Sequence, residues 1–175
     1  LSLYMLGNVL RAATESSLDR VLVVGSDDKV MDVAKDAGAE WVVDSGGGLN
    51  HELQMVFDVL SESDIASIYV PADLPFLETV DIEALIRDSD SGKLIALCPD
   101  NSDEGTNGLL IPPDIDFRPL LGHQSYYRHI SVLEQLKLPY TVCVSAGWGL
   151  DIDSPKDLES LAEIHTDFKN QISAM

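Results

Sequence analysis

The chain alternates short apolar runs with longer stretches in which apolar residues recur every three or four positions. The apolar runs predict strands over 20–25, 40–43, 68–70, 94–98, 109–111 and 139–145. The periodic stretches predict helices over 1–13, 29–37, 51–60, 81–87, 126–136 and 155–169. Strands that alternate with helices favour a three-layer α/β/α sandwich with a mainly parallel sheet. We therefore predict a single α/β domain over residues 1–175.

An acid stands directly after the predicted strand at 68–70, in the stretch Val70-Pro71-Ala72-Asp73-Leu74-Pro75. In an open α/β sheet, ligands bind just beyond the carboxyl ends of the strands, where Asp73 would lie. A turn aspartate that closes a strand would explain the same letters. Asp73 alone therefore leaves both interpretations open.

A second acidic element lies far downstream, in Gly149-Leu150-Asp151-Ile152-Asp153-Ser154-Pro155. If this stretch is extended, the carboxylates of Asp151 and Asp153 project from one face of the backbone. A strand-to-helix junction would explain the serine and the proline, but not the two acids on one face. Because hard cations take oxygen ligands and share them with phosphates, we predict that Asp73 holds Mg²⁺ together with Asp151 or Asp153.

A glycine-rich stretch runs from Ser45 to Asn50. It matches neither a Walker loop nor Gly-x-Gly-x-x-Gly, so a flexible turn remains one interpretation. The other is a nucleotide-binding loop, in which the backbone of Gly47, Gly48 and Leu49 lets a flat ring or a ribose approach. The side chain of Asn50 would then offer a paired donor and acceptor.

Polar residues in the second half of the chain predict a substrate site. Thr106 and Asn107 place a hydroxyl and an amide at the start of a strand, where a hairpin turn would use the same residues. Gly122 and Ser125 precede the helix predicted at 126–136, and free amides at such a helix start can hold an anion. His129 lies one turn further along the same side of the helix, where it would help to hold the anion. An ordinary surface histidine is the alternative interpretation.

The charge balance limits the partners. Lysine and arginine total 11 against 30 acids, for a net charge of −19. This balance argues against nucleic acid and anionic membrane surfaces, which require basic patches. An anionic substrate must then be held by metal, backbone amides or helix ends. Cys98 and Cys143 lie in apolar runs with no pairing pattern, which favours buried free thiols and a cytoplasmic protein. A homodimer is compatible with the sequence.

Five motifs occur in order and carry a family resemblance. They are Gly48-Leu49-Asn50, Pro71-Ala72-Asp73-Leu74-Pro75, Gly105-Thr106-Asn107, Gly122-x-x-Ser125-x-x-x-His129 and Leu150-Asp151-Ile152-Asp153-Ser154-Pro155. Together they resemble the 2-phospho-L-lactate guanylyltransferase family, which serves the synthesis of the deazaflavin coenzyme F-420. The resemblance covers nearly the whole chain, and five motifs in register are specific even though each one alone is not.

The resemblance implies a GT-A-like nucleotidyltransferase fold, GTP as the donor and a phosphorylated three-carbon acid as the acceptor. In relatives that acid is 2-phospho-L-lactate, phosphoenolpyruvate or 3-phosphoglycerate. The resemblance further implies that Asp73, Asp151 and Asp153 hold Mg²⁺. It places Thr106, Gly122 and Ser125 at the acceptor and the Gly48–Asn50 loop near the guanosine. The alternatives are another nucleotidyltransferase of this fold, a non-catalytic nucleotide-binding homologue and, least favoured, a structural interaction protein.

The chain departs from the family pattern in two places. Leu121 stands where the family usually has phenylalanine, which is a mild change. The family also opens with a strand and a basic Pro-x-Lys…Lys-x-Arg loop that grips the triphosphate, whereas Leu1 corresponds to the helix that follows. We therefore expect a strand and a basic loop upstream of Leu1 in the natural protein. A genomic reading frame that starts at Leu1 would contradict this expectation.

Overall fold

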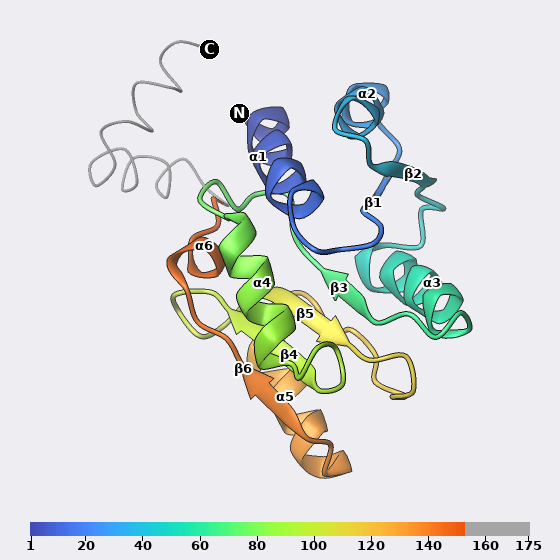
Figure 1. Cartoon of the computed structure of the whole chain (residues 1–175). Helices are drawn as coiled ribbons and strands as arrows, with labels where there is room; N and C mark the ends of the chain where they lie inside the picture. The colour runs from blue at the N-terminus through green and yellow to red at the C-terminus, as the bar shows by residue number, and fades with distance from the viewer. Residues whose placement is uncertain (153–175) are drawn as a thin grey trace.

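The computed structural model of the chain describes residues 1–152 and confirms the predicted α/β architecture (Figure 1). The helices are α1 (Ser2–Thr14), α2 (Asp28–Asp36), α3 (Leu49–Ser61), α4 (Thr79–Asp88), α5 (Ser125–Leu136) and α6 (Ala146–Gly149). The strands are β1 (Leu22–Gly25), β2 (Glu40–Val43), β3 (Ser67–Tyr69), β4 (Ile95–Pro99), β5 (Thr106–Ile111) and β6 (Tyr140–Val142). The helix predicted over 155–169 lies outside the described residues.

The helix starts show how local sequence chooses the boundaries. The side chain of Asp27 accepts hydrogen bonds from the backbone amides of Lys29 and Val30, at 2.8 and 3.2 Å, and so begins α2. Helix α3 begins at Leu49, earlier than predicted, because Gly48 caps it at a φ of 87°. Helix α5 was predicted to begin at residue 126, after Ser125, and begins one residue earlier. The cap is Gln124, at a φ of 52°, and Ser125 is the first helical residue.

The described strands form two separate sheets. Strands β1 and β2 pair in parallel, and the second sheet has the order β3-β5-β4-β6. Strand β4 pairs in parallel with β6, whereas β5 runs antiparallel to both β3 and β4. Strands β3, β4 and β6 therefore share one direction, and their carboxyl ends lie at a common rim of the sheet.

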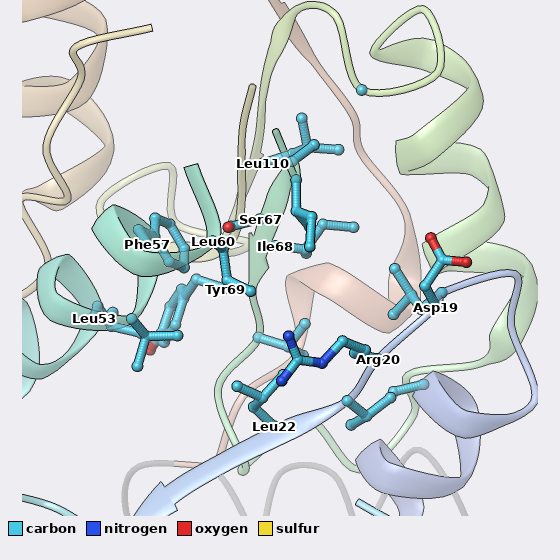
Figure 2. A pocket seen from close by; sticks show the side chains of 18 of the residues that line it. Asp19, Arg20, Leu22, Leu53, Phe57, Leu60, Ser67, Ile68, Tyr69 and Leu110 are labelled. Atoms are coloured by element: carbon cyan, nitrogen blue, oxygen red, sulfur yellow. The ribbon is translucent and has the colours of Figure 1, made fainter. Parts of the chain in front are cut away.

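Between the two sheets lies an apolar groove of about 930 Å³. Within residues 1–152, β1 pairs only with β2 and β3 only with β5, so the edges that face each other across the groove have no strand between them. Figure 2 shows Leu22 of β1 on one side and Ile68 and Tyr69 of β3 on the other, with α3 contributing part of the lining. The groove reaches Leu49 at the glycine-rich loop and Ala72 beside Asp73.

The core has one apolar cluster on each face of the larger sheet. The first cluster joins α1 and α4 to β4 and β5, and it also contains the fully buried Leu74 and Trp148. The second joins α3 and α5 to the opposite side of β4 and β5. Cys98 and Cys143 are buried free thiols, as predicted. No helix within residues 1–152 is long and apolar enough to cross a membrane.

Candidate active site

The two acidic motifs meet at one rim of the larger sheet. Asp73 lies in the turn that follows β3, and its backbone carbonyl accepts a hydrogen bond from the amide of Ile152 at 3.2 Å. The neighbouring Asp151 is therefore brought to the same place, across a separation of nearly eighty residues in sequence. Asp153 lies outside the described residues. Within residues 1–152 no three His, Cys, Asp or Glu side chains gather as a metal site, so the three-carboxylate site remains a prediction.

Helix α6, which the sequence analysis did not predict, carries the chain to Asp151. The Ser145 hydroxyl accepts a hydrogen bond from the Trp148 amide at 3.3 Å and caps this short helix. The Asn107 side-chain nitrogen donates to the Trp148 carbonyl at 2.8 Å, and the backbone amide of Asn101 donates to the Gly149 carbonyl at 2.9 Å. The side chain of Asn107, predicted to bind substrate, thus holds the segment that leads to Asp151.

Thr106, Ser125 and His129 form a buried polar cluster between β5 and the start of α5. The Ser125 hydroxyl donates to the Thr106 oxygen at 3.2 Å, and the Thr106 oxygen lies 3.0 Å from Nδ1 of His129. Nε2 of His129 accepts a hydrogen bond from the Leu120 amide at 2.8 Å. Because Nε2 is an acceptor, the neutral ring carries its proton on Nδ1 and donates it to Thr106. The structure therefore brings together three residues that were predicted to share one substrate site.

His129 differs from the surface or ligand-facing histidine that we predicted. Its side chain is 0% exposed, and its ring lies 5.8 Å from that of Phe117. Burial, with a smaller effect of the Arg128 charge, lowers the pKa of His129 from 6.5 to about 4. The imidazole is therefore neutral at physiological pH. Both ring nitrogens are engaged, by Thr106 and by the backbone of Leu120, so the imidazole would influence a substrate through these two groups.

The segment from Leu120 to Gly122 is held by side chains from two helices. Nη2 of Arg128 donates to the carbonyls of Leu120 and Leu121, at 2.7 and 3.1 Å. The side chain of Asn50 donates to the Leu121 carbonyl at 3.0 Å and accepts from the Leu121 amide at 2.7 Å. Gly122 follows at a φ of 111°, a conformation that side-chain-bearing residues rarely adopt, and its carbonyl accepts from the Ser125 amide at 3.0 Å.

The glycine-rich loop is organised by a buried acid. The carboxylate of Glu52 accepts three hydrogen bonds. They come from the Ser45 amide, the Ser45 hydroxyl and the Gly47 amide, at 3.1, 2.5 and 3.0 Å. These hydrogen bonds, that of the Ser45 hydroxyl foremost, lower the pKa of Glu52. The loop is therefore an ordered turn around a carboxylate, and the interpretation as a merely flexible turn does not fit.

Sequence reasoning missed Glu52 and Arg128. Each is a charged residue within a helix, a position where a solvated side chain is the usual expectation, and no local pattern distinguishes them. Arg128 places a positive charge beside Gly122, in a chain whose net charge is −19. Arg128 can therefore attract an anion. From the sequence, we had expected only metal, backbone amides and helix ends to do so.

The predicted groups form one connected arrangement. The glycine-rich loop is tied through Asn50 to Leu121, and the following turn leads to Ser125 and Thr106. Asn107, the next residue along β5, is tied to the segment that carries Asp151 to Asp73. The arrangement therefore combines a loop suited to a nucleotide, hydroxyls and a cation suited to a small anion, and carboxylates suited to a hard cation.

Comparison with known proteins matches residues 1–171 to the family described as "Guanylyl transferase CofC like". The chain is 34% identical over 162 residues to a phosphoenolpyruvate guanylyltransferase from Rubrobacter xylanophilus, covering 92% of this chain and 79% of that one. It is 30% identical over 148 residues to a 2-phospho-L-lactate guanylyltransferase from Methanocaldococcus fervens, covering 84% and 66%.

Among solved structures, the chain resembles 4-diphosphocytidyl-2C-methyl-D-erythritol synthase with a TM-score of 0.66. The similarity covers 90% of this chain and 88% of that one, at 14% sequence identity. At this identity the similarity shows a shared nucleotidyltransferase fold alone.

Proposed function

The chain belongs to the family of CofC-like guanylyl transferases, and from this premise we propose that it transfers GMP from GTP to a phosphorylated three-carbon acid. The acceptor candidates are phosphoenolpyruvate, 2-phospho-L-lactate and 3-phosphoglycerate. The first two appear in the names of relatives, and the reaction would serve the synthesis of coenzyme F-420. The observation that carries the proposal is the connected arrangement of glycine-rich loop, buried hydroxyls and acidic rim.

The acceptor would lie against Thr106, Gly122 and Ser125. The Thr106 oxygen receives hydrogen bonds from Ser125 and from His129, so its own hydrogen is directed to a third acceptor, for which an anionic oxygen of the substrate is suited. Arg128 adds the positive charge that a phosphate or carboxylate requires. The first two amides of α5 do not add to this site, contrary to the prediction from the sequence, because those of Ser125 and Tyr126 donate to the carbonyls of Gly122 and Glu104.

The acidic rim fits a magnesium ion. Asp73 and Asp151 provide the oxygen ligands that this ion prefers, and the contact between Ile152 and Asp73 brings them to one place. We propose that these residues hold Mg²⁺ together with Asp153. When bound, Mg²⁺ would neutralise charge on the triphosphate as the leaving group departs.

The chemistry needs no protein base. An acceptor phosphate oxygen is ionised at neutral pH and can attack the α-phosphorus of GTP directly. The new P–O bond joins GMP to the phospho-acid. The bond between the α-phosphorus and the oxygen that bridges to the β-phosphate breaks, and pyrophosphate leaves. The contribution of this chain is then alignment of the two substrates and electrostatic stabilisation. The buried, neutral His129 agrees with this scheme, because a base is not required there.

The predicted basic triphosphate loop and the strand before it remain part of the proposal. The groove between β1 and β3 supports it, because the facing edges have no partner strand within residues 1–152 and the lining is apolar. A strand inserted there would pair with both edges and would end near the glycine-rich loop and Asp73. A version extended upstream of Leu1 should therefore melt at a higher temperature and bind GTP more tightly.

One experiment tests the proposed function. The protein is incubated with GTP, Mg²⁺ and each candidate acid in turn, and the product is identified by mass. We expect a guanosine diphospho-acid with one acceptor strongly preferred, and no product when Mg²⁺ is replaced by EDTA. Product only with another nucleotide or acceptor would favour a different nucleotidyltransferase of this fold. GTP binding without pyrophosphate release would favour a non-catalytic homologue.

A further inference from the structure

Asn50 was predicted to offer its amide to a nucleotide, yet both ends of that amide are engaged elsewhere. Its nitrogen donates to the Leu121 carbonyl at 3.0 Å, and its oxygen accepts from the Leu121 amide at 2.7 Å. The two bonds form a closed pair of the kind that joins adjacent antiparallel strands, and they fix both the position and the orientation of the backbone of one residue, Leu121. Asn50 and Leu121 are 71 residues apart in sequence.

The position of Asn50 places it between the two substrate groups. It is the second residue of α3, two positions after Gly48, which is the last residue of the glycine-rich stretch before the helix. Leu121 lies directly before Gly122, which begins the turn leading to Ser125 and Thr106. A rigid pair of hydrogen bonds therefore connects the end of one loop to the beginning of the other.

From this geometry we infer that Asn50 is a positioning residue that sets the acceptor segment 120–122 relative to the glycine-rich loop, and that it does not recognise guanine. This inference rests on the proposed function for the names of the two substrates. The tether itself rests on the hydrogen bonds alone. Its role is to hold Gly122 where the acceptor and the nucleotide meet, because in-line transfer depends on the relative placement of the two reactants.

The other contacts of the segment show why Asn50 is the specific link. Arg128 and His129 also bond to Leu120 or Leu121, but both belong to α5, which follows the segment closely in sequence. Those bonds fold the segment onto its own helix. The Asn50 bonds instead join the segment to the start of α3, where the glycine-rich stretch ends.

The test compares Asn50→Ala with Gln54→Ala. Gln54 lies one turn further along α3, and its amide nitrogen donates to Asp58 within the same helix at 2.6 Å, so this control removes an amide without touching the acceptor segment. Amide hydrogen exchange is followed for the peptide containing Leu120–Gly122. We expect exchange there to rise on the order of tenfold in Asn50→Ala and to stay unchanged in Gln54→Ala.

Base selection provides the second readout. The Kd values for GTP, ITP and ATP are measured by competition, without turnover. We expect Asn50→Ala to keep the GTP-to-ATP preference within about twofold, and its KM for the phospho-acid to rise on the order of tenfold. Unchanged exchange at Leu120–Gly122, or a lost preference for guanine, would overturn the inference. An inactive wild-type protein would instead count against the proposed function, since exchange and nucleotide binding are measured without catalysis.

Discussion

Replacement of His129 by leucine tests whether the buried imidazole organises the acceptor site. Leucine has a similar volume and fills the space beside Phe117, but it removes both ring nitrogens. The Leu120 amide and the Thr106 hydroxyl then each lose a partner, of which Thr106 is buried and Leu120 half-buried. An unsatisfied buried group costs about 1–3 kcal/mol, so we expect the variant to be less stable by about 2–4 kcal/mol at pH 7.5.

The pH dependence makes this prediction specific to the imidazole. Because the folded pKa of about 4 lies below the ordinary value of 6.5, the unfolded chain binds a proton first as the pH falls. The wild-type protein therefore loses stability between pH 6.5 and 4, by about 3 kcal/mol from this group. The leucine variant lacks the group, so the difference between the two proteins should nearly vanish at pH 4.

Urea unfolding followed by tryptophan fluorescence measures the two stabilities across this pH range. Other titrating groups are common to both proteins and cancel in the difference. A His129→Gln variant keeps one donor and one acceptor, so it should recover part of the stability at pH 7.5. Because glutamine does not titrate either, the stability difference between this variant and wild type should change with pH by the same amount as for the leucine variant. A gap that stays constant from pH 7.5 to 4 would refute the buried neutral histidine.

Three further outcomes are expected. Asp73→Asn and Asp151→Asn should each reduce the rate of guanylyl transfer about 100-fold or more, while their melting temperatures stay within a few degrees of wild type. Asp116→Asn, at an exposed position, is the control. Near-normal turnover in either of the first two variants would contradict the metal assignment. Glu52→Gln should raise the KM for GTP several-fold, since the loop amides lose a charged acceptor. The same weakening should appear in wild type as the pH falls through the lowered pKa of Glu52, and a KM for GTP that is insensitive to both changes would argue against an ordered nucleotide loop. Gly122→Ala, at a φ of 111°, should strain the segment by about 1–3 kcal/mol and raise the acceptor KM about tenfold without changing the Kd for GTP; equal acceptor KM values would show that the turn has no part in the site.

The alternation of apolar runs and periodic stretches was enough to predict the α/β class and most of the elements. Local chemistry also determines particular boundaries, such as the Asp27 cap of α2, because the capping side chain lies within a few residues of the amides it accepts from. The starts of α3 at Leu49 and of α5 at Ser125 were not predicted, because local residue type does not mark them. Each depends on a backbone conformation, at Gly48 and Gln124, that residue type alone does not require.

The motifs predicted the candidate site as a set of residues, because each one is a short local signal at a strand end or helix start, and the structure brings several of them into contact. Which side chain touches which was decided only by the tertiary structure. Asn50 contacts Leu121 and Asn107 contacts Trp148 because α3, α5 and the β4–β5 pair pack against one another, and no local pattern encodes those distances. The burial that makes His129 neutral likewise comes from residues distant in sequence, so its charge state could be known only once the core had formed.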